Sequence, residues 1–172
     1  MKAWCALIVV AALTACTAKP PAPGYRDDSP LSITTRDDDK RLAGDWQVRG
    51  YYPGDDALQQ VAFLPEWQGT PAFELVTRSC EDTGDCEDVG EIWRAKSLGP
   101  NRWTISGPHS EAERELWVVW VDEGYRTAAI GAPDGRYGWV LDRTAKGGAD
   151  RIKAAREILD FNGYDIGAMI LR

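Results

Sequence analysis

The residues of this sequence with the greatest capacity for chemistry are its cysteines and its single histidine. Cys80 and Cys86 are separated by five residues, which is not the spacing of a redox-active pair. His109 stands in the turn-like run Gly-Pro-His-Ser-Glu and has no second histidine with which to form a zinc site or a catalytic pair. These residues therefore predict neither a metal site nor a catalytic centre.

Other signatures of catalysis are also absent from the sequence. It contains no Gly-x-Ser-x-Gly elbow and no glycine-rich loop that would cradle a phosphate. One acidic run lacks the spacing of an EF-hand calcium loop and indicates solvated charge; it consists of Glu81, Asp82, Asp85, Glu87 and Asp88. We therefore expect a protein that is not an enzyme and that needs no cofactor.

Length and charge limit the remaining classes of protein. The chain has 172 residues, of which 44% are hydrophobic, and this is enough for one globular core. Its formal net charge is −7, and it has no basic stripe of the kind that binds a phosphate backbone. We expect a single acidic domain that does not bind nucleic acid.

The N-terminus has the layout of a secretory signal peptide over residues 1–15, with a positive start, an apolar run and small residues. The run Leu13-Thr14-Ala15-Cys16 resembles the bacterial lipobox, and this resemblance implies that Cys16 is acylated and becomes the first mature residue. Thr17 is not the aspartate that retains such proteins in the inner membrane. The resemblance therefore implies a lipid anchor in the outer membrane, with the domain facing the periplasm.

Of the four cysteines, Cys5 leaves with the signal peptide and Cys16 is acylated, so Cys80 and Cys86 remain. Cys80 and Cys86 should form a disulfide, because an exported protein meets an oxidising compartment. Residues 16–40 follow the signal peptide and are rich in proline and aspartate, with little to bury. We therefore predict a lipidated N-terminus and flexible tether over residues 16–40 and a folded domain over residues 41–172.

The folded domain shows an all-β pattern of short β-branched and aromatic runs separated by Gly, Pro, Asp and Asn turns. Eight strands are predicted, at residues 45–52, 58–64, 71–78, 89–97, 102–106, 115–121, 125–131 and 136–143. A meander of this size removes its edges by closing into an up-and-down antiparallel β-barrel, whose interior is just wide enough for one small ligand. One amphipathic helix over residues 148–161 should pack outside the barrel, and a short final strand should follow over residues 166–171.

Three elements in this order resemble the lipocalin family, and specifically its bacterial lipoprotein branch related to apolipoprotein D. Gly44-Asp45-Trp46 matches the family's Gly-x-Trp at the first strand. Asp122-Glu123-Gly124-Tyr125 occupies the turn after the sixth strand, and Tyr137 to Arg143 is similar to the family's closing strand with its arginine. The resemblance implies that the Arg143 guanidinium lies across the Trp46 indole at the narrow end of the barrel, where such a stack contributes about 1–2 kcal/mol.

Alternation along the strands predicts which side chains face the interior. If Trp46 and Trp139 point inward, the wall of a ligand-binding calyx consists of Val48, Tyr52, Trp117, Val119, Tyr137, Trp139 and Leu141. The alternative is that these side chains fill a solid core. A short turn follows the first strand where the family has a long loop over the mouth, so the lid is reduced and the size of the ligand is left open.

These observations give two hypotheses about function. The first is an outer-membrane lipocalin that binds a small hydrophobic molecule, such as a fatty acid or a lysophospholipid, for storage or transport in the envelope. The second is a protein-binding envelope factor, an inhibitor or a scaffold, that uses the mouth loops and the disulfide hairpin of a filled barrel.

Overall fold

The computed structural model describes residues 24–109 and 112–172, so the predicted signal peptide and Cys16 lie outside the described residues. The described chain contains a short helix, eight long strands, a second helix and a two-residue strand. In chain order these are α1 (Asp39–Leu42), β1 (Gly44–Tyr51), β2 (Leu58–Trp67), β3 (Thr70–Cys80), β4 (Cys86–Gly99), β5 (Arg102–Ser106), β6 (Arg114–Val121), β7 (Thr127–Gly131), β8 (Gly138–Asp142), α2 (Ala149–Phe161) and β9 (Ile170–Leu171).

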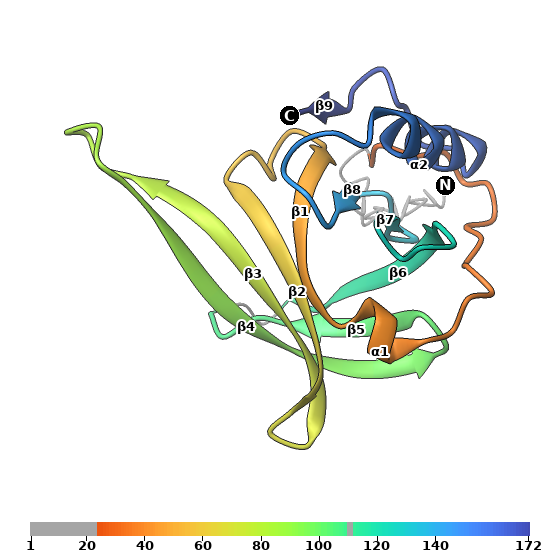
Figure 1. The fold of residues 1–172 in the computed structure, drawn as a ribbon, viewed down its shortest axis with the longest axis horizontal. Coiled ribbons are helices and arrows are strands. Elements are labelled where there is room, and N and C mark those ends of the chain that lie inside the picture. The colour runs from red at the N-terminus through yellow and green to blue at the C-terminus, as the bar shows by residue number, and fades with distance from the viewer. Residues whose placement is uncertain (1–23, 110–111) are drawn as a thin grey trace, which may run out of the picture.

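The eight long strands form a closed antiparallel barrel, which confirms the predicted fold (Figure 1). Each strand pairs with the next in sequence, and β1 closes the sheet by pairing with both β2 and β8. Val48 lies opposite Leu141 and Trp46 lies opposite Val61 in these two pairings. Closure leaves β1 with no free edge along most of its length, and β9 covers its last two residues.

The predicted order of elements is correct, and the differences lie at their ends. β4 begins at Cys86 and β3 ends at Cys80, so the hairpin between them is longer than predicted. β7 begins only at Thr127 because Tyr125 has a left-handed backbone, with φ of 54°, that belongs to a turn. The final strand is limited to Ile170 and Leu171, and the sequence did not predict α1.

The long β3–β4 hairpin projects from the barrel wall (Figure 1). Its two strands are joined across their ends by a disulfide between Cys80 and Cys86, which confirms the predicted pairing. Residues 78–90 are all exposed, and Arg78 and Asp88 form an ion pair of 2.8 Å across the two strands. The outer half of the hairpin therefore contributes nothing to the barrel core.

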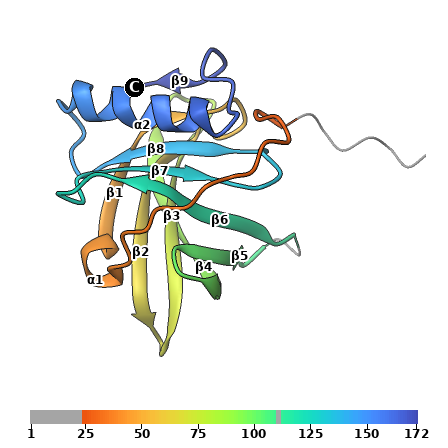
Figure 2. The ribbon, with the colours of Figure 1, turned by 90° about the vertical axis from the view of Figure 1, so that its right-hand side faces the viewer.

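Helix α2 covers β6, β7 and β8 on the outside of the barrel (Figure 2). Its buried face consists of Ile152, Ala155 and Leu159, as the amphipathic pattern predicted. This face packs in a second apolar cluster with Val119, Val140 and other residues that point out of the barrel. Neither helix in the described part of the chain combines the length and the apolar character that a membrane crossing requires.

Residues 24–38, here called the strap, run along the outside of the barrel. The sequence predicted a flexible tether through residue 40, but the backbone N–H of Asp27 donates to Gly163 and that of Thr34 donates to Val118. The Asn101 amide donates to the carbonyls of Thr34 and Arg36. The strap binds through its backbone and a few side chains, which is why its polar composition gave no sign of packing.

Candidate functional site

One end of the barrel is closed by Arg143 and Trp46. The guanidinium carbon of Arg143 lies 3.7 Å from the centroid of the Trp46 ring, which is the stack that the sequence resemblance implies. Arg143 also donates hydrogen bonds to the carbonyls of Asp45, Arg41, Leu42 and Ala43, at 2.7–3.1 Å. The carbonyls at the end of α1 are therefore satisfied by one side chain, whose pKa is lowered by burial.

The β6–β7 turn completes this closed end. Asp122 accepts hydrogen bonds from the backbone N–H groups of Arg126 and Thr127, at 2.5 and 2.8 Å. Burial alone would raise the pKa of Asp122, but these hydrogen bonds and the Arg126 guanidinium lower it overall. Arg41 covers the Tyr125 ring at 4.1 Å. Gly44, Trp46, Asp122, Tyr125 and Arg143, which the sequence singled out, thus lie together.

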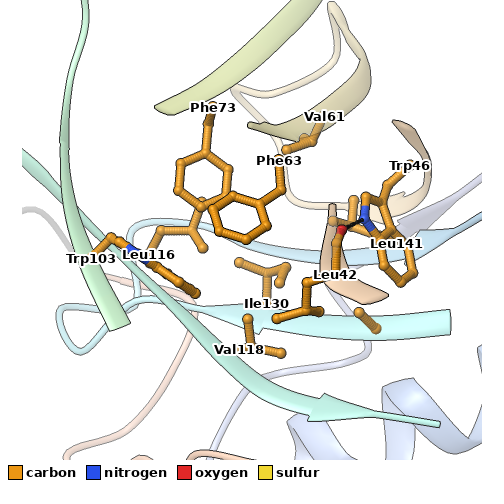
Figure 3. Close-up of a pocket in the computed structure, with 11 residues that line it drawn as sticks. Leu42, Trp46, Val61, Phe63, Phe73, Trp103, Leu116, Val118, Ile130 and Leu141 are labelled. Atoms are coloured by element: carbon orange, nitrogen blue, oxygen red, sulfur yellow. Dashed lines mark hydrogen bonds between the residues drawn. The ribbon is translucent and has the colours of Figure 1, made fainter. Parts of the chain in front are cut away.

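An apolar cavity of about 20 Å³ lies inside the barrel next to this closed end (Figure 3). Its walls come from α1 and from every barrel strand except β4, with none from β9, and they expose almost no polar surface. The lining residues are Leu42, Trp46, Val61, Phe63, Phe73, Trp103, Leu116, Val118, Ala128, Ile130 and Leu141. A cavity of this size has room for about one water molecule, so the barrel interior is nearly filled and does not have the vacant calyx that the sequence suggested.

Aromatic rings occupy much of the interior. Phe63 stacks on Phe73 with ring centroids 5.0 Å apart, and Trp103 lies 5.2 and 5.4 Å from these two rings. The sequence did not assign these three residues to the wall, because the facing of β2, β3 and β5 could not be fixed without their registers.

Four of the seven predicted wall residues point inward. Val48, Tyr137, Trp139 and Leu141 all belong to the interior core cluster. Of these, Leu141 contacts the apolar cavity. Alternation from Trp46 and Trp139 therefore gave the correct facing on β8 and on the first half of β1.

The other three predicted wall residues point outward: Tyr52 because the alternation of β1 breaks before it, and Trp117 and Val119 because the opposite face of β6 is the interior one. The register of β1 shifts between Val48 and Gly50, and Tyr52 packs outside against Tyr25 and Tyr164 at 4.4 and 5.7 Å. On β6 the interior residues are Leu116 and Val118, so Trp117 and Val119 occupy the outer face. The sequence offered two adjacent apolar faces on β6, and the aromatic one was the wrong choice.

Along β8 and the residue before it, the inward side chains follow one another from the mouth of the barrel to its closed end. Tyr137 lines a pocket at the mouth, Leu141 lines the apolar cavity, and Trp139 lies between them on the same face. The Trp139 indole N–H donates to Asp55 at 2.8 Å, and the Tyr137 hydroxyl donates to the Glu115 carbonyl. These hydrogen bonds hold a layer of two rings, 4.7 Å apart, between the two spaces.

The mouth pocket has a volume of about 300 Å³ and a polar character. It is lined by Pro53, Gly54, Asp55, Ala112, Glu113, Arg114, Asp134, Arg136 and Tyr137. The Arg114 guanidinium faces the Trp93 and Tyr137 rings at 5.2 and 5.9 Å, whereas Arg136 pairs with Asp134 at 3.2 Å. Burial raises the pKa of Asp55, and the Trp139 hydrogen bond opposes this shift. Polar groups thus gather above Trp139 and apolar groups below it.

Metal ligands do not converge anywhere in residues 24–109 and 112–172: no group of three His, Cys, Asp or Glu side chains is placed to hold an ion. His109 is exposed in the β5–β6 connection. The candidate site offers apolar contact in the cavity and a few charged groups at the mouth.

Comparisons with known proteins agree with this architecture. Residues 96–172 match a family model described as a lipocalin-like domain. A segment of 55 residues is 36% identical to Temperature-induced lipocalin-1 of Arabidopsis thaliana, and it covers 32% of this chain and 30% of that relative. The chain therefore aligns with less than a third of the plant protein's length.

Solved structures extend the likeness to most of the chain. Apocrustacyanin C1 and apocrustacyanin C2 each superpose with a TM-score of 0.58 and 11% identity, over 87% of this chain and 88% of theirs. Lobster apocrustacyanin A1 has the same TM-score and 12% identity, over 89% of this chain and 92% of its own. The fold is that of a lipocalin, and the two sequence matches support the lipocalin family.

Proposed function

We propose that this protein is a binding lipocalin, of the bacterial lipoprotein branch related to apolipoprotein D, that takes up a small amphipathic ligand through the mouth of its barrel. The mature chain would be anchored in the outer membrane by acylated Cys16, with its barrel in the periplasm. The ligand class is a fatty acid or a lysophospholipid, held for storage or transport. No catalytic step is required.

The observation that carries this proposal is the order of environments along β8. An apolar cavity lies below Trp139 and a polar pocket lies above it, which matches a molecule with a hydrocarbon tail and a charged head. Arg114 lies at the rim of the polar pocket, where it could pair with a carboxylate or a phosphate. Each buried methylene of the tail would contribute about 0.8 kcal/mol.

The small volume of the apolar cavity sets a condition on this function. An acyl chain can enter only if Trp139 and the rings of Phe63, Phe73 and Trp103 leave their present positions. Binding would therefore break the hydrogen bond between Trp139 and Asp55 and change the environment of several indoles. Tryptophan fluorescence should report this rearrangement directly.

The test is a titration of the delipidated domain from the strap onward with a fatty acid and with the alcohol of equal chain length. We expect one-to-one binding of both by native mass spectrometry, with a change in tryptophan emission, and weaker binding of the alcohol. Arg114→Met should reduce this preference for the acid. Arg102→Met is the matched control, since Arg102 lies over the outer residue Trp117 at 5.3 Å. Absence of any saturable binding would overturn the proposal.

A second function is favoured by a different observation. The barrel interior is nearly filled, and the outer half of the β3–β4 hairpin is exposed and bears five acidic residues beside its disulfide. This arrangement suits a scaffold or inhibitor that binds a basic protein surface. Failure to bind any lipid, together with a partner that is lost when residues 81–85 are replaced by a two-residue turn, would favour this function.

A further inference from the structure

The strap begins at the mouth of the barrel. The Tyr25 N–H donates to the Gly135 carbonyl at 2.6 Å, and its hydroxyl donates to the Pro53 carbonyl at 2.8 Å. Pro53 lies in the β1–β2 connection and Gly135 in the β7–β8 connection, and both connections border the mouth pocket. Gly24 packs so closely on Asp134 that an added Cβ would lie 2.4 Å from its carbonyl oxygen.

From the mouth, the strap runs back along the barrel to α1 at the closed end (Figure 2). A free tether over residues 16–40 would have left the closed end nearest to the lipid anchor, since the barrel begins with α1 and β1. Because the strap is fixed against the barrel, the chain toward Cys16 instead departs from the mouth. The lipid anchor and the ligand entrance are therefore on the same end of the molecule.

The distance between them is limited by the length of the chain. Seven residues lie between Cys16 and Gly24 in the sequence, so their Cα atoms are eight steps apart. Even fully extended, they span at most about 29 Å. We propose that the mouth of the barrel faces the bilayer that holds the lipid anchor, so that a ligand passes between membrane and barrel without crossing bulk water. This inference rests on the proposed lipidation of Cys16.

Phe161 supports the same orientation. It is the last residue of α2 and is 84% exposed, whereas its neighbour Asn162 is buried. The strap holds this end of the helix, because the Ser32 N–H donates to the Asn162 side chain at 2.7 Å and Arg26 donates to the Asn162 carbonyl at 3.3 Å. The most exposed large hydrophobic side chain of the described residues therefore lies beside the start of the strap, where it would meet the lipid interface.

The charge of the β3–β4 hairpin indicates which lipid surface fits. Glu81, Asp82, Asp85, Glu87 and Asp88 are all exposed near its tip. An anionic bilayer would repel them, whereas a zwitterionic one would not. The proposed contact surface is therefore a bilayer of phosphatidylcholine or phosphatidylethanolamine type.

The experiment uses the full acylated chain with its disulfide, reconstituted into phosphatidylcholine vesicles that carry nitroxide head groups. A fluorophore is attached at Asp134→Cys, beside the mouth, or at Glu123→Cys, in the exposed turn of the closed end. We expect the Asp134 label to be quenched at least twofold more strongly than the Glu123 label. Equal quenching, or stronger quenching of the Glu123 label, would overturn the orientation.

Two variants separate this inference from the function on which it rests. A flexible insert of 20 residues after residue 18 should abolish the difference in quenching and leave acylation and fatty acid binding unchanged. Phe161→Ser should weaken vesicle contact of the unacylated domain, whereas Leu98→Ser, at the β4–β5 turn of the closed end, should not.

An intact mass without acyl chains would remove both the anchor and the orientation. Acylated protein with equal quenching would remove the orientation alone.

Discussion

The Trp139 indole N–H lies 2.8 Å from the carboxylate of Asp55, and this hydrogen bond joins the β1–β2 connection to the middle of β8. Trp139 is fully buried and lies along the chain between Tyr137, which lines the mouth pocket, and Leu141, which lines the apolar cavity. Asp55 belongs to the short connection that takes the place of a long lid. The carboxylate therefore restrains both the ring that divides the interior and the loop at the entrance.

Asp55→Asn should stabilise the fold at neutral pH. Burial raises the pKa of Asp55, so the folded state holds the proton more tightly than the unfolded chain does. The contribution of this group to stability is therefore greatest below the ordinary carboxyl pKa, and it falls as the pH rises from that value through the raised one. Asparagine has no charge to bury at neutral pH, so it avoids the cost of desolvating a carboxylate. Its side-chain oxygen still accepts the indole hydrogen bond.

Urea unfolding of wild type and Asp55→Asn at several pH values measures this effect. The difference in unfolding free energy should favour the variant at pH 7 and vanish near pH 3. Asp82→Asn, at the exposed tip of the distant β3–β4 hairpin, is the control. A difference that grew as the pH fell would contradict the assignment.

Trp139→Ala should connect the two spaces of the barrel. The substitution removes a buried ring, so we expect a loss of about 3–5 kcal/mol in unfolding free energy. It also removes the need to displace that ring, and a short-chain fatty acid should bind on the order of tenfold more tightly because one hydrogen bond no longer has to break. Calorimetric titration gives the affinity. Trp120→Ala, at the outer cluster, should leave it unchanged, and an equal affinity for wild type and Trp139→Ala would exclude Trp139 as the barrier.

Arg143→Lys should open the closed end. Lysine keeps the positive charge but loses the planar stack on Trp46 and cannot reach the four carbonyls that Arg143 now satisfies. We expect a loss of about 2–4 kcal/mol in thermal or denaturant unfolding. Arg136→Lys, whose ion pair is largely exposed, should cost less than about 0.5 kcal/mol. Equal losses of unfolding free energy for the two substitutions would mean that the Arg143 stack stabilises the fold no more than an exposed ion pair does.

The sequence predicted the order of elements because the turns and apolar runs of this protein are local signals. The barrel and the outer helix follow from such patterns, whereas the disulfide was predicted from the expected export of the chain to an oxidising compartment. The strap could not be predicted in this way, because its stability comes from backbone hydrogen bonds to residues as distant as Gly135 and Gly163. The volume of the interior could not be predicted from the sequence either, since it depends on the rotamers of rings such as Phe63 and Trp103 that belong to different strands.

Facing was predicted correctly where the alternation is unbroken and only one face of the strand is apolar. On β8 the period of two holds from Tyr137 to Leu141, and all three residues point inward. On β1 the register shift after Val48 turns Tyr52 to the outside, and nothing in the residue types of that segment marks the shift. Strand β6 has a further difficulty, because the helix α2 gives its outer face an apolar neighbour. Both faces of β6 are therefore apolar, and hydrophobicity cannot distinguish them.

The facing of β6 can be tested by truncating two adjacent residues. Leu116 is fully buried in the interior cluster, so Leu116→Ala should lower the unfolding free energy by about 2–5 kcal/mol. Trp117 is partly exposed on the outer face, where its indole N–H reaches only the exposed Glu115 carboxylate at 3.0 Å. Trp117→Ala should therefore cost about 1 kcal/mol, even though it removes the larger side chain. Because the two residues are adjacent on one strand and point to opposite faces, denaturant unfolding of both variants decides which face of β6 lies inside the barrel. A greater loss for Trp117→Ala would place the aromatic face of β6 inside the barrel.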